Sequence, residues 1–130
     1  MLNVTPVRVA VIEDSPEFLS AIEALLTEIP GAVLAGTSAA ADDAIQLLRK
    51  ARPDLVLLDV FLAHGTGLDV LRSLRAEGNQ TTIVVMTGTP SPEMEAACRG
   101  LGASEFVDKA DLLKWLPDVL ERARTSGAAH

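Results

Sequence analysis

Five short runs of apolar, β-prone residues recur along the chain, and they constrain its fold more than any other feature. They are Val7–Ile12, Val33–Gly36, Leu55–Leu58, Ile83–Met86 and Glu105–Val107. The first, third and fourth runs show little polar alternation, which is typical of strands buried on both faces. Parallel strands need crossover connections, and crossovers are right-handed. The pattern therefore favours an open parallel sheet covered by helices on both faces.

Helical patterns fill the segments between these runs. Apolar side chains recur at helical spacing in 18–29 and again in 94–101, so each segment has one face to bury. Ser15 and Ser91 each precede a proline, and this pairing is a helix start signal: the serine accepts an orphan backbone hydrogen bond, and proline fits the first helical position. Five strands alternating with five helices give an α/β fold.

The last helix is expected to be interrupted. Pro117 lacks a backbone N–H, and its ring clashes with the preceding turn of a helix, so it would break a helix begun at Asp111. The sequence predicts a short turn over Asp111–Trp115 and a main helix from about Pro117 to Arg124.

Size and charge exclude several classes of protein. The 130 residues predict one domain, with a core from about 7 to 124 and short tails. The net charge of −7 argues against binding to nucleic acid or to anionic lipid. No apolar run approaches the roughly 20 residues that span a bilayer, and the N-terminus lacks a signal-peptide pattern. We expect a cytoplasmic protein, and a lone Cys98 that packs in the core without a function.

Polar residues gather where the predicted strands end. Glu13 and Asp14 follow the first run, Asp59 the third, Thr87 the fourth and Lys109 the fifth. Ligand sites of open parallel sheets lie at this carboxyl edge. Two carboxylates about 4 Å apart repel by about 4 kcal/mol at an effective dielectric of about 20, so the acids need a cation beyond Lys109. Hard oxygen ligands around a partly hydrated site favour Mg²⁺.

Four segments carry a resemblance to a known family: VAVIEDSP, PDLVLLDVFLAHGTGLDVLRSLR, IVVMTGTP and GASEFVDK. In this order and at strand ends, they resemble the receiver domain of two-component response regulators, from Val7 to about Arg124. The resemblance implies a flavodoxin-like, or CheY-like, fold: a doubly wound five-stranded parallel sheet of order 2-1-3-4-5 with five helices. It also implies a phosphorylated switch that assists only its own phosphorylation and dephosphorylation, and is otherwise no enzyme.

The resemblance assigns the acids to an acceptor and a metal site. Asp59 would be the phosphoacceptor, taking its phosphoryl group from a sensor histidine kinase or a histidine phosphotransfer protein. Asp14, Asp59 and the backbone carbonyl of Phe61 would be direct Mg²⁺ ligands, with Glu13 a ligand through water.

The resemblance also assigns residues that would bind the phosphoryl group and respond to it. Thr87 and Lys109 would bind its oxygens, and Thr87 and Phe106 would act as the switch pair. The fourth helix, fifth strand and last helix would then form the surface for a second copy or an effector.

The chain departs from the family pattern at two residues close to the predicted site. The family commonly has proline where this chain has Ala63, four residues after the acceptor, and where it has Ala110, directly after the lysine. A cis bond costs roughly 2.5–4 kcal/mol before a non-proline residue. The sequence leaves open whether the Lys109–Ala110 bond is cis or trans.

Two other functions compete with the receiver. A phosphohydrolase with a nucleophilic aspartate uses similar chemistry, but typically places its nucleophile after the first strand, and a substrate cap is missing here. A flavin-nucleotide binder would need a phosphate loop rich in Ser, Thr and Gly where this chain has EDSPE. If the chain is a receiver domain, it could be a complete regulator or a piece of a longer one.

Overall fold

A five-stranded parallel sheet of order β2-β1-β3-β4-β5 forms the centre of the computed structural model, which describes residues 5–128. Every strand predicted from the sequence is present, as is the predicted strand order. The strands are β1 Val7–Ile12, β2 Ala32–Ser38, β3 Leu55–Asp59, β4 Thr82–Thr87 and β5 Glu105–Asp108.

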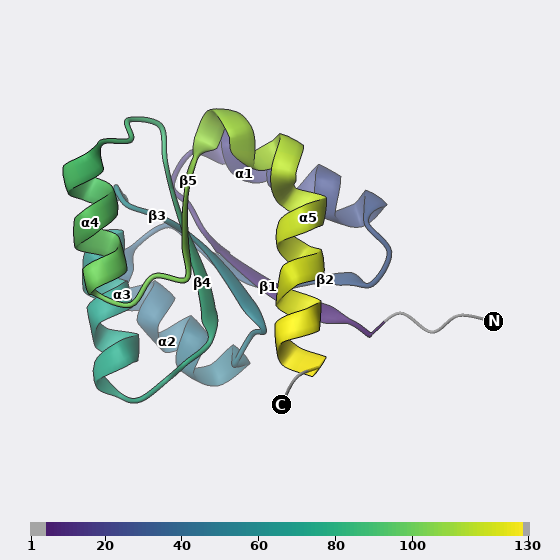
Figure 1. Ribbon diagram of the computed structural model, residues 1–130, viewed down its shortest axis with the longest axis horizontal. Coiled ribbons are helices and arrows are strands. Elements are labelled where there is room, and N and C mark those ends of the chain that lie inside the picture. Colours follow the sequence, from purple (N-terminus) through teal and green to yellow (C-terminus); the bar gives the residue numbers. More distant parts are fainter. Residues whose placement is uncertain (1–4, 129–130) are drawn as a thin grey trace.

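Five helices alternate with the strands and cover both faces of the sheet, so the predicted α/β fold is confirmed (Figure 1). Ser15 and Ser91 cap their helices as predicted, each accepting a backbone N–H from three residues further on. The helices are α1 Pro16–Glu28, α2 Ala41–Ala51, α3 Gly67–Ala76, α4 Pro92–Gly100 and α5 Lys109–Ala128.

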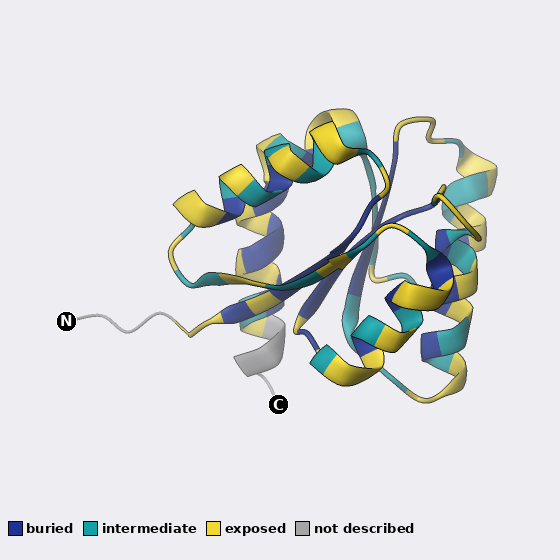
Figure 2. Ribbon diagram, turned by 180° about the vertical axis from the view of Figure 1, so that it is seen from behind, coloured by how far each residue is buried: buried dark blue, intermediate teal, exposed yellow. Residues whose placement is uncertain are grey.

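The core has two halves, one on each side of the sheet. Helices α1 and α5 pack on one face, over side chains such as Val9, Leu57 and Met86. Helices α2, α3 and α4 pack on the other, over side chains such as Ile12, Leu58 and Val85. Figure 2 shows the central strands buried, whereas edge strand β2 is half-buried or exposed throughout. The sheet is therefore a rigid base whose strand ends can hold side chains in fixed places.

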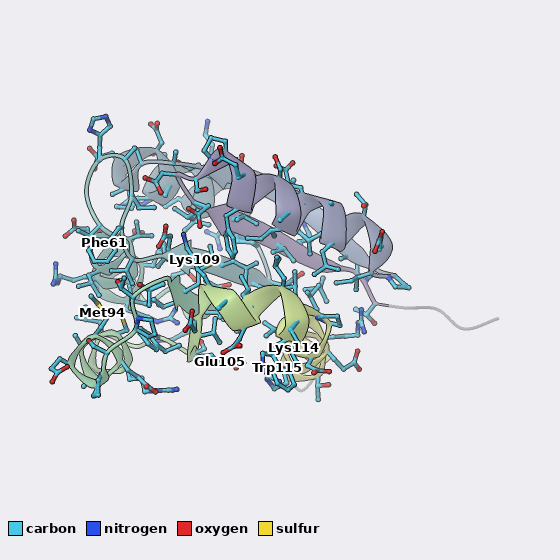
Figure 3. All side chains as sticks on the ribbon, turned by 90° about the horizontal axis from the view of Figure 1, so that it is seen from above. Phe61, Met94, Glu105, Lys109, Lys114 and Trp115 are labelled. Atoms are coloured by element: carbon cyan, nitrogen blue, oxygen red, sulfur yellow. The ribbon has the colours of Figure 1, made fainter. Side chains whose placement is uncertain are left out.

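Helix α5 departs from the sequence prediction. It runs unbroken from Lys109 to Ala128 with Pro117 inside it, so the predicted break after Trp115 is wrong. Its first turns nonetheless run in a different direction from the rest of the helix (Figures 1 and 3), as expected of a proline bend. Leu116 and Val119 are buried on either side of the proline. Packing of this apolar face against the sheet offsets the lost hydrogen bond.

Every strand but β1 extends further than predicted, and for β3 and β4 the extension reaches the site. Asp59 and Thr87 are the last residues of β3 and β4 rather than the first residues beyond them. The reason is pairing, because Asp59 lies opposite Met86 and Thr87 lies opposite Asp108. Both polar side chains are thus fixed by sheet backbone. Within 5–128, no helix is long and apolar enough to cross a membrane.

Candidate functional site

Three carboxylates meet at the carboxyl edge of the sheet. Glu13 and Asp14 follow β1, Asp59 ends the adjacent strand β3, and one carboxylate oxygen from each lies within 4.8 Å of the others. Glu13 and Asp59 are only 1% and 3% exposed, whereas Asp14 is exposed. The predicted acidic cluster is therefore present, with two acids buried and one facing solvent.

Lys109 supplies positive charge to this cluster. It is the first residue of α5, and its Nζ lies 2.9 Å from Asp59 Oδ2 and 2.7 Å from Glu13 Oε1. Figure 3 shows Lys109 between α1 and the start of α5. Burial alone would lower the pKa of the Lys109 ammonium, but the two carboxylates outweigh burial and raise it. The Lys109–Ala110 bond, left open by the sequence, is trans, because residues 5–128 contain no cis peptide bond.

Glu13 is held in place but incompletely paired. Its Oε2 accepts the backbone N–H of Ser15 at 2.9 Å. Its Oε1 forms an ion pair with the Lys109 ammonium at 2.7 Å and has no other partner among the described residues. Burial, partly offset by Lys109, raises the pKa of the Glu13 carboxyl. Three carboxylates that share one ammonium suit a hard cation.

A glycine lets the chain fold back directly after Asp59. The backbone N–H of Gly67 bonds the carbonyl of Val60 at 2.7 Å. A Cβ at Gly67 would lie 2.2 Å from the Asp59 carbonyl oxygen, so a side chain there cannot be accommodated. Thr66 and Asp69 then form a capping box that starts α3. The loop after Asp59 is thus fixed at both ends.

Phe61 lies in this loop, two residues after Asp59. Its backbone N–H donates to Asp59 Oδ1 at 3.3 Å, and its side chain is 54% exposed. Both oxygens of Asp59 therefore have a donor, Phe61 on one side and Lys109 on the other. The predicted use of the Phe61 carbonyl as a metal ligand stays a prediction.

The two predicted switch residues, Thr87 and Phe106, make contacts other than with the three carboxylates. Thr87 is fully buried, and its hydroxyl accepts the backbone N–H of Thr89 at 3.1 Å. Phe106 is half-buried opposite Val85, against the core half beneath α4. Their roles remain predictions.

Sequence reasoning missed one residue of the site. The Lys109 ammonium lies 4.9 Å from the centre of the Phe18 ring, in the first turn of α1. Phe18 was interpreted only as part of the apolar face of its helix. No local pattern reveals the contact, because it joins residues far apart in the chain.

Solved structures resemble this one closely. The non-phosphorylated receiver domain of the stress response regulator RcsB from Escherichia coli has a TM-score of 0.85 at 20% identity, covering 94% of this chain and 95% of that one. The response regulator domain of Thermotoga maritima CheB has a TM-score of 0.84 at 14% identity, covering 92% and 97%. At such identities the likeness shows the fold.

Proteins that are similar in sequence show the family to which the chain belongs. A protein-glutamate methylesterase/protein-glutamine glutaminase from a Nocardioides strain is 30% identical over 105 residues, which are 79% of this chain and 29% of that protein. The chain spans about half or less of the length of the curated relatives it matches. The pattern of the response regulator receiver domain matches residues 9–118. The chain therefore belongs to the response regulator receiver domain family, whose members are typically phosphorylated on aspartate in a Mg²⁺-dependent reaction.

Proposed function

We propose that Asp59 is the residue that accepts the phosphoryl group in this receiver. The observation that carries the proposal is the convergence of three carboxylates and one ammonium around Asp59 at the end of β3. The donor would be a phosphohistidine on a sensor histidine kinase or a histidine phosphotransfer protein. The chain would act as a switch in the cytoplasm, and residues 7–124 would form one unit that does this alone.

The site fits Mg²⁺. Glu13, Asp14, Asp59 and the Phe61 carbonyl would hold the ion, with Glu13 acting through water. The excess of three carboxylates over one ammonium supports this assignment. When bound, Mg²⁺ would neutralise charge on the phosphoryl oxygens.

Asp59 would act as the nucleophile. One carboxylate oxygen of Asp59 would form a bond to phosphorus while the phosphorus–nitrogen bond of the donor breaks. The electron pair of the broken bond would leave with the protonated histidine nitrogen. Lys109 would move from Asp59 Oδ2 to a phosphoryl oxygen, staying within the site. The hydroxyl of Thr87, now paired with Thr89, would turn to another phosphoryl oxygen. Donors that meet the phosphoryl oxygens in this way stabilise a loose transition state without other machinery.

The signal would leave through Phe106. Turning of Thr87 frees space beside α4, and Phe106 can then bury its ring fully, without a hydroxyl to satisfy. Burial worth up to roughly 1.5–3 kcal/mol is enough to shift a two-state equilibrium about tenfold or more. The surface of α4, β5 and α5 would change shape and bind an effector or a second copy. Amide chemical shifts with and without beryllofluoride would test this route, which predicts changes across Met94–Leu101.

The experiment that tests the proposal uses Asp59→Asn. Wild-type chain treated with Mg²⁺ and phosphoramidate should gain the mass of one phosphoryl group, and Asp59→Asn should gain none. Asp42→Asn is the matched control, because Asp42 is an exposed acid on α2. Undiminished phosphorylation of Asp59→Asn would overturn the assignment. Sustained turnover of a generic phosphate ester would instead favour the phosphohydrolase.

A further inference from the structure

A closed ring of contacts joins the start of α1 to the lysine of the site. Glu13 Oε2 accepts the N–H of Ser15 at 2.9 Å, and Ser15 Oγ accepts the N–H of Phe18 at 3.3 Å. The Phe18 ring lies 4.9 Å from the Lys109 ammonium, which in turn lies 2.7 Å from Glu13 Oε1. The helix cap that begins α1 therefore also fixes the aromatic ring next to the site.

We infer that Phe18 is a positioning residue for phosphoryl transfer, holding the Lys109 ammonium between Glu13 and Asp59 with the face of its ring. The inference rests on the proposed function, because it assigns Phe18 a part in the reaction at Asp59. Phe18 touches the lysine and none of the reacting atoms, so its effect on the reaction passes through Lys109.

The lysine needs such a support. Its ammonium ends a flexible four-carbon chain that readily points to water, which hydrates it strongly. Only 20% of the Lys109 side chain is exposed. The two carboxylates hold the ammonium from one side, and the negative face of an aromatic ring attracts it from another. An aliphatic side chain in place of Phe18 would fill similar space without this attraction.

The Phe18 ring matters most when Lys109 exchanges its ion pair with Asp59 for one with the phosphoryl group. During transfer, the ammonium gives up Asp59 Oδ2 for a phosphoryl oxygen, and at that moment it has lost one of its two carboxylate partners. Phe18 does not change partners, because its ring packs against the core half beneath α1 and α5. It keeps the ammonium inside the site while the carboxylate contact is broken.

The test compares variants that keep or remove the ring. Phe18→Leu and Phe18→Met stay apolar, Phe18→Tyr keeps the aromatic face, and Leu25→Ala removes a contact of α1 with the same core half far from Lys109. Phosphorylation by phosphoramidate at saturating Mg²⁺ should slow about fivefold in the Leu and Met variants. The rate of Phe18→Tyr and Leu25→Ala should stay near wild type, and Mg²⁺ affinity should stay near wild type in all four.

A double-mutant cycle separates positioning from a merely structural effect. In a Lys109→Ala background, Phe18→Leu should cause no further slowing, because the ring then has no ammonium to hold. Equal slowing with and without Lys109, or wild-type rates in both Phe18→Leu and Phe18→Met, would overturn the inference and leave the proposed function intact. A wild-type chain that is not phosphorylated at all would overturn both.

Discussion

The two ends of the sheet use polar side chains in opposite ways. At the carboxyl end, Glu13, Asp59 and Thr87 are buried polar residues crowded into one place. Together with the exposed Asp14, the two buried acids share the single ammonium of Lys109. This end therefore holds excess negative charge in place before any ligand arrives.

At the amino end, polar side chains close the loops. Arg75, near the end of α3, donates to the carbonyl of Gly102 at 3.0 and 2.9 Å and to that of Asn79 at 2.7 Å. Thr81 donates its hydroxyl to the carbonyl of Pro53 at 2.8 Å. These contacts satisfy backbone groups that helix and strand ends leave open.

The difference teaches where stability and function lie in this fold. Polar residues at the amino end satisfy partners within the chain, so their loss should weaken the fold and leave the chemistry alone. Acids at the carboxyl end outnumber the single ammonium beside them and repel one another, so the loss of one acid should weaken the chemistry and relieve the fold. Each of the following predictions can break or sharpen this contrast.

The largest effect on stability is expected for Arg75→Ala. The change removes the donors for two backbone carbonyls and should lower the free energy of unfolding by about 2 kcal/mol. Phosphorylation of the folded variant should keep its wild-type rate, because Arg75 lies at the far end of the sheet. Urea denaturation and phosphoramidate labelling measure the two quantities.

Arg72→Ala is the matched control for Arg75. Arg72 lies on the same helix, but its side chain is 61% exposed and pairs only with Asp69 at 3.4 Å. Exposed pairs of this kind contribute roughly 0–1 kcal/mol. If both variants unfold alike, or if Arg75→Ala slows phosphorylation, the amino end does not have the structural role assigned to it.

At the carboxyl end, Asp14→Ala should do the reverse. Loss of one metal ligand should weaken Mg²⁺ binding by about tenfold or more, while relief of repulsion with Glu13 and Asp59 should raise the melting temperature of the metal-free chain by about 1–3 °C. Calorimetry gives both values. Glu28→Ala, an exposed acid at the end of α1, should change neither. A clear loss of metal-free stability in Asp14→Ala would show that the acids are not a strained cluster.

The sequence predicted one end of the sheet better than the other. Glu13, Asp14, Asp59 and Lys109 could be placed because parallel strands deliver their last residues to one edge, whatever the details of packing. The role of Arg75 could not be foreseen. Its partner Gly102 lies 27 residues away, and the contact depends on how two loops meet.

The helices show the same division between local and distant causes. Ser15 and Ser91 were interpreted correctly as caps because capping is local. Pro117 was interpreted as a break because local propensity disfavours proline in a helix, whereas burial of Leu116 and Val119 in the tertiary structure kept α5 continuous. Phe18 was missed as a neighbour of Lys109 for the same reason as Arg75.

The smallest expected effect concerns Cys98, which is buried near the end of α4. Its thiol is fully buried one turn before Gly102, and burial raises its pKa. A raised pKa in the folded state means that the buried thiol contributes its full stability below its ordinary pKa of 9.0, and that this contribution is lost as pH rises through the raised value. The stability of the chain should therefore fall as pH rises toward this range, because the unfolded thiol ionises more readily than the folded one.

Cys98→Ala isolates this loss from other groups that titrate at high pH. At pH 7 the wild type should be the more stable of the two, because alanine leaves a small cavity. From pH 8 to pH 9 that advantage should shrink, as measured by urea denaturation at each pH. A constant difference between wild type and Cys98→Ala at every pH would mean that folding does not raise the pKa of the thiol.

Arg75→Ala should make the native thiol react faster with a thiol reagent, and Arg72→Ala should not, if Arg75 holds the end of α4 in place through Gly102. Equal thiol reactivity in the wild type and Arg75→Ala would mean that Arg75 does not keep the end of α4 closed.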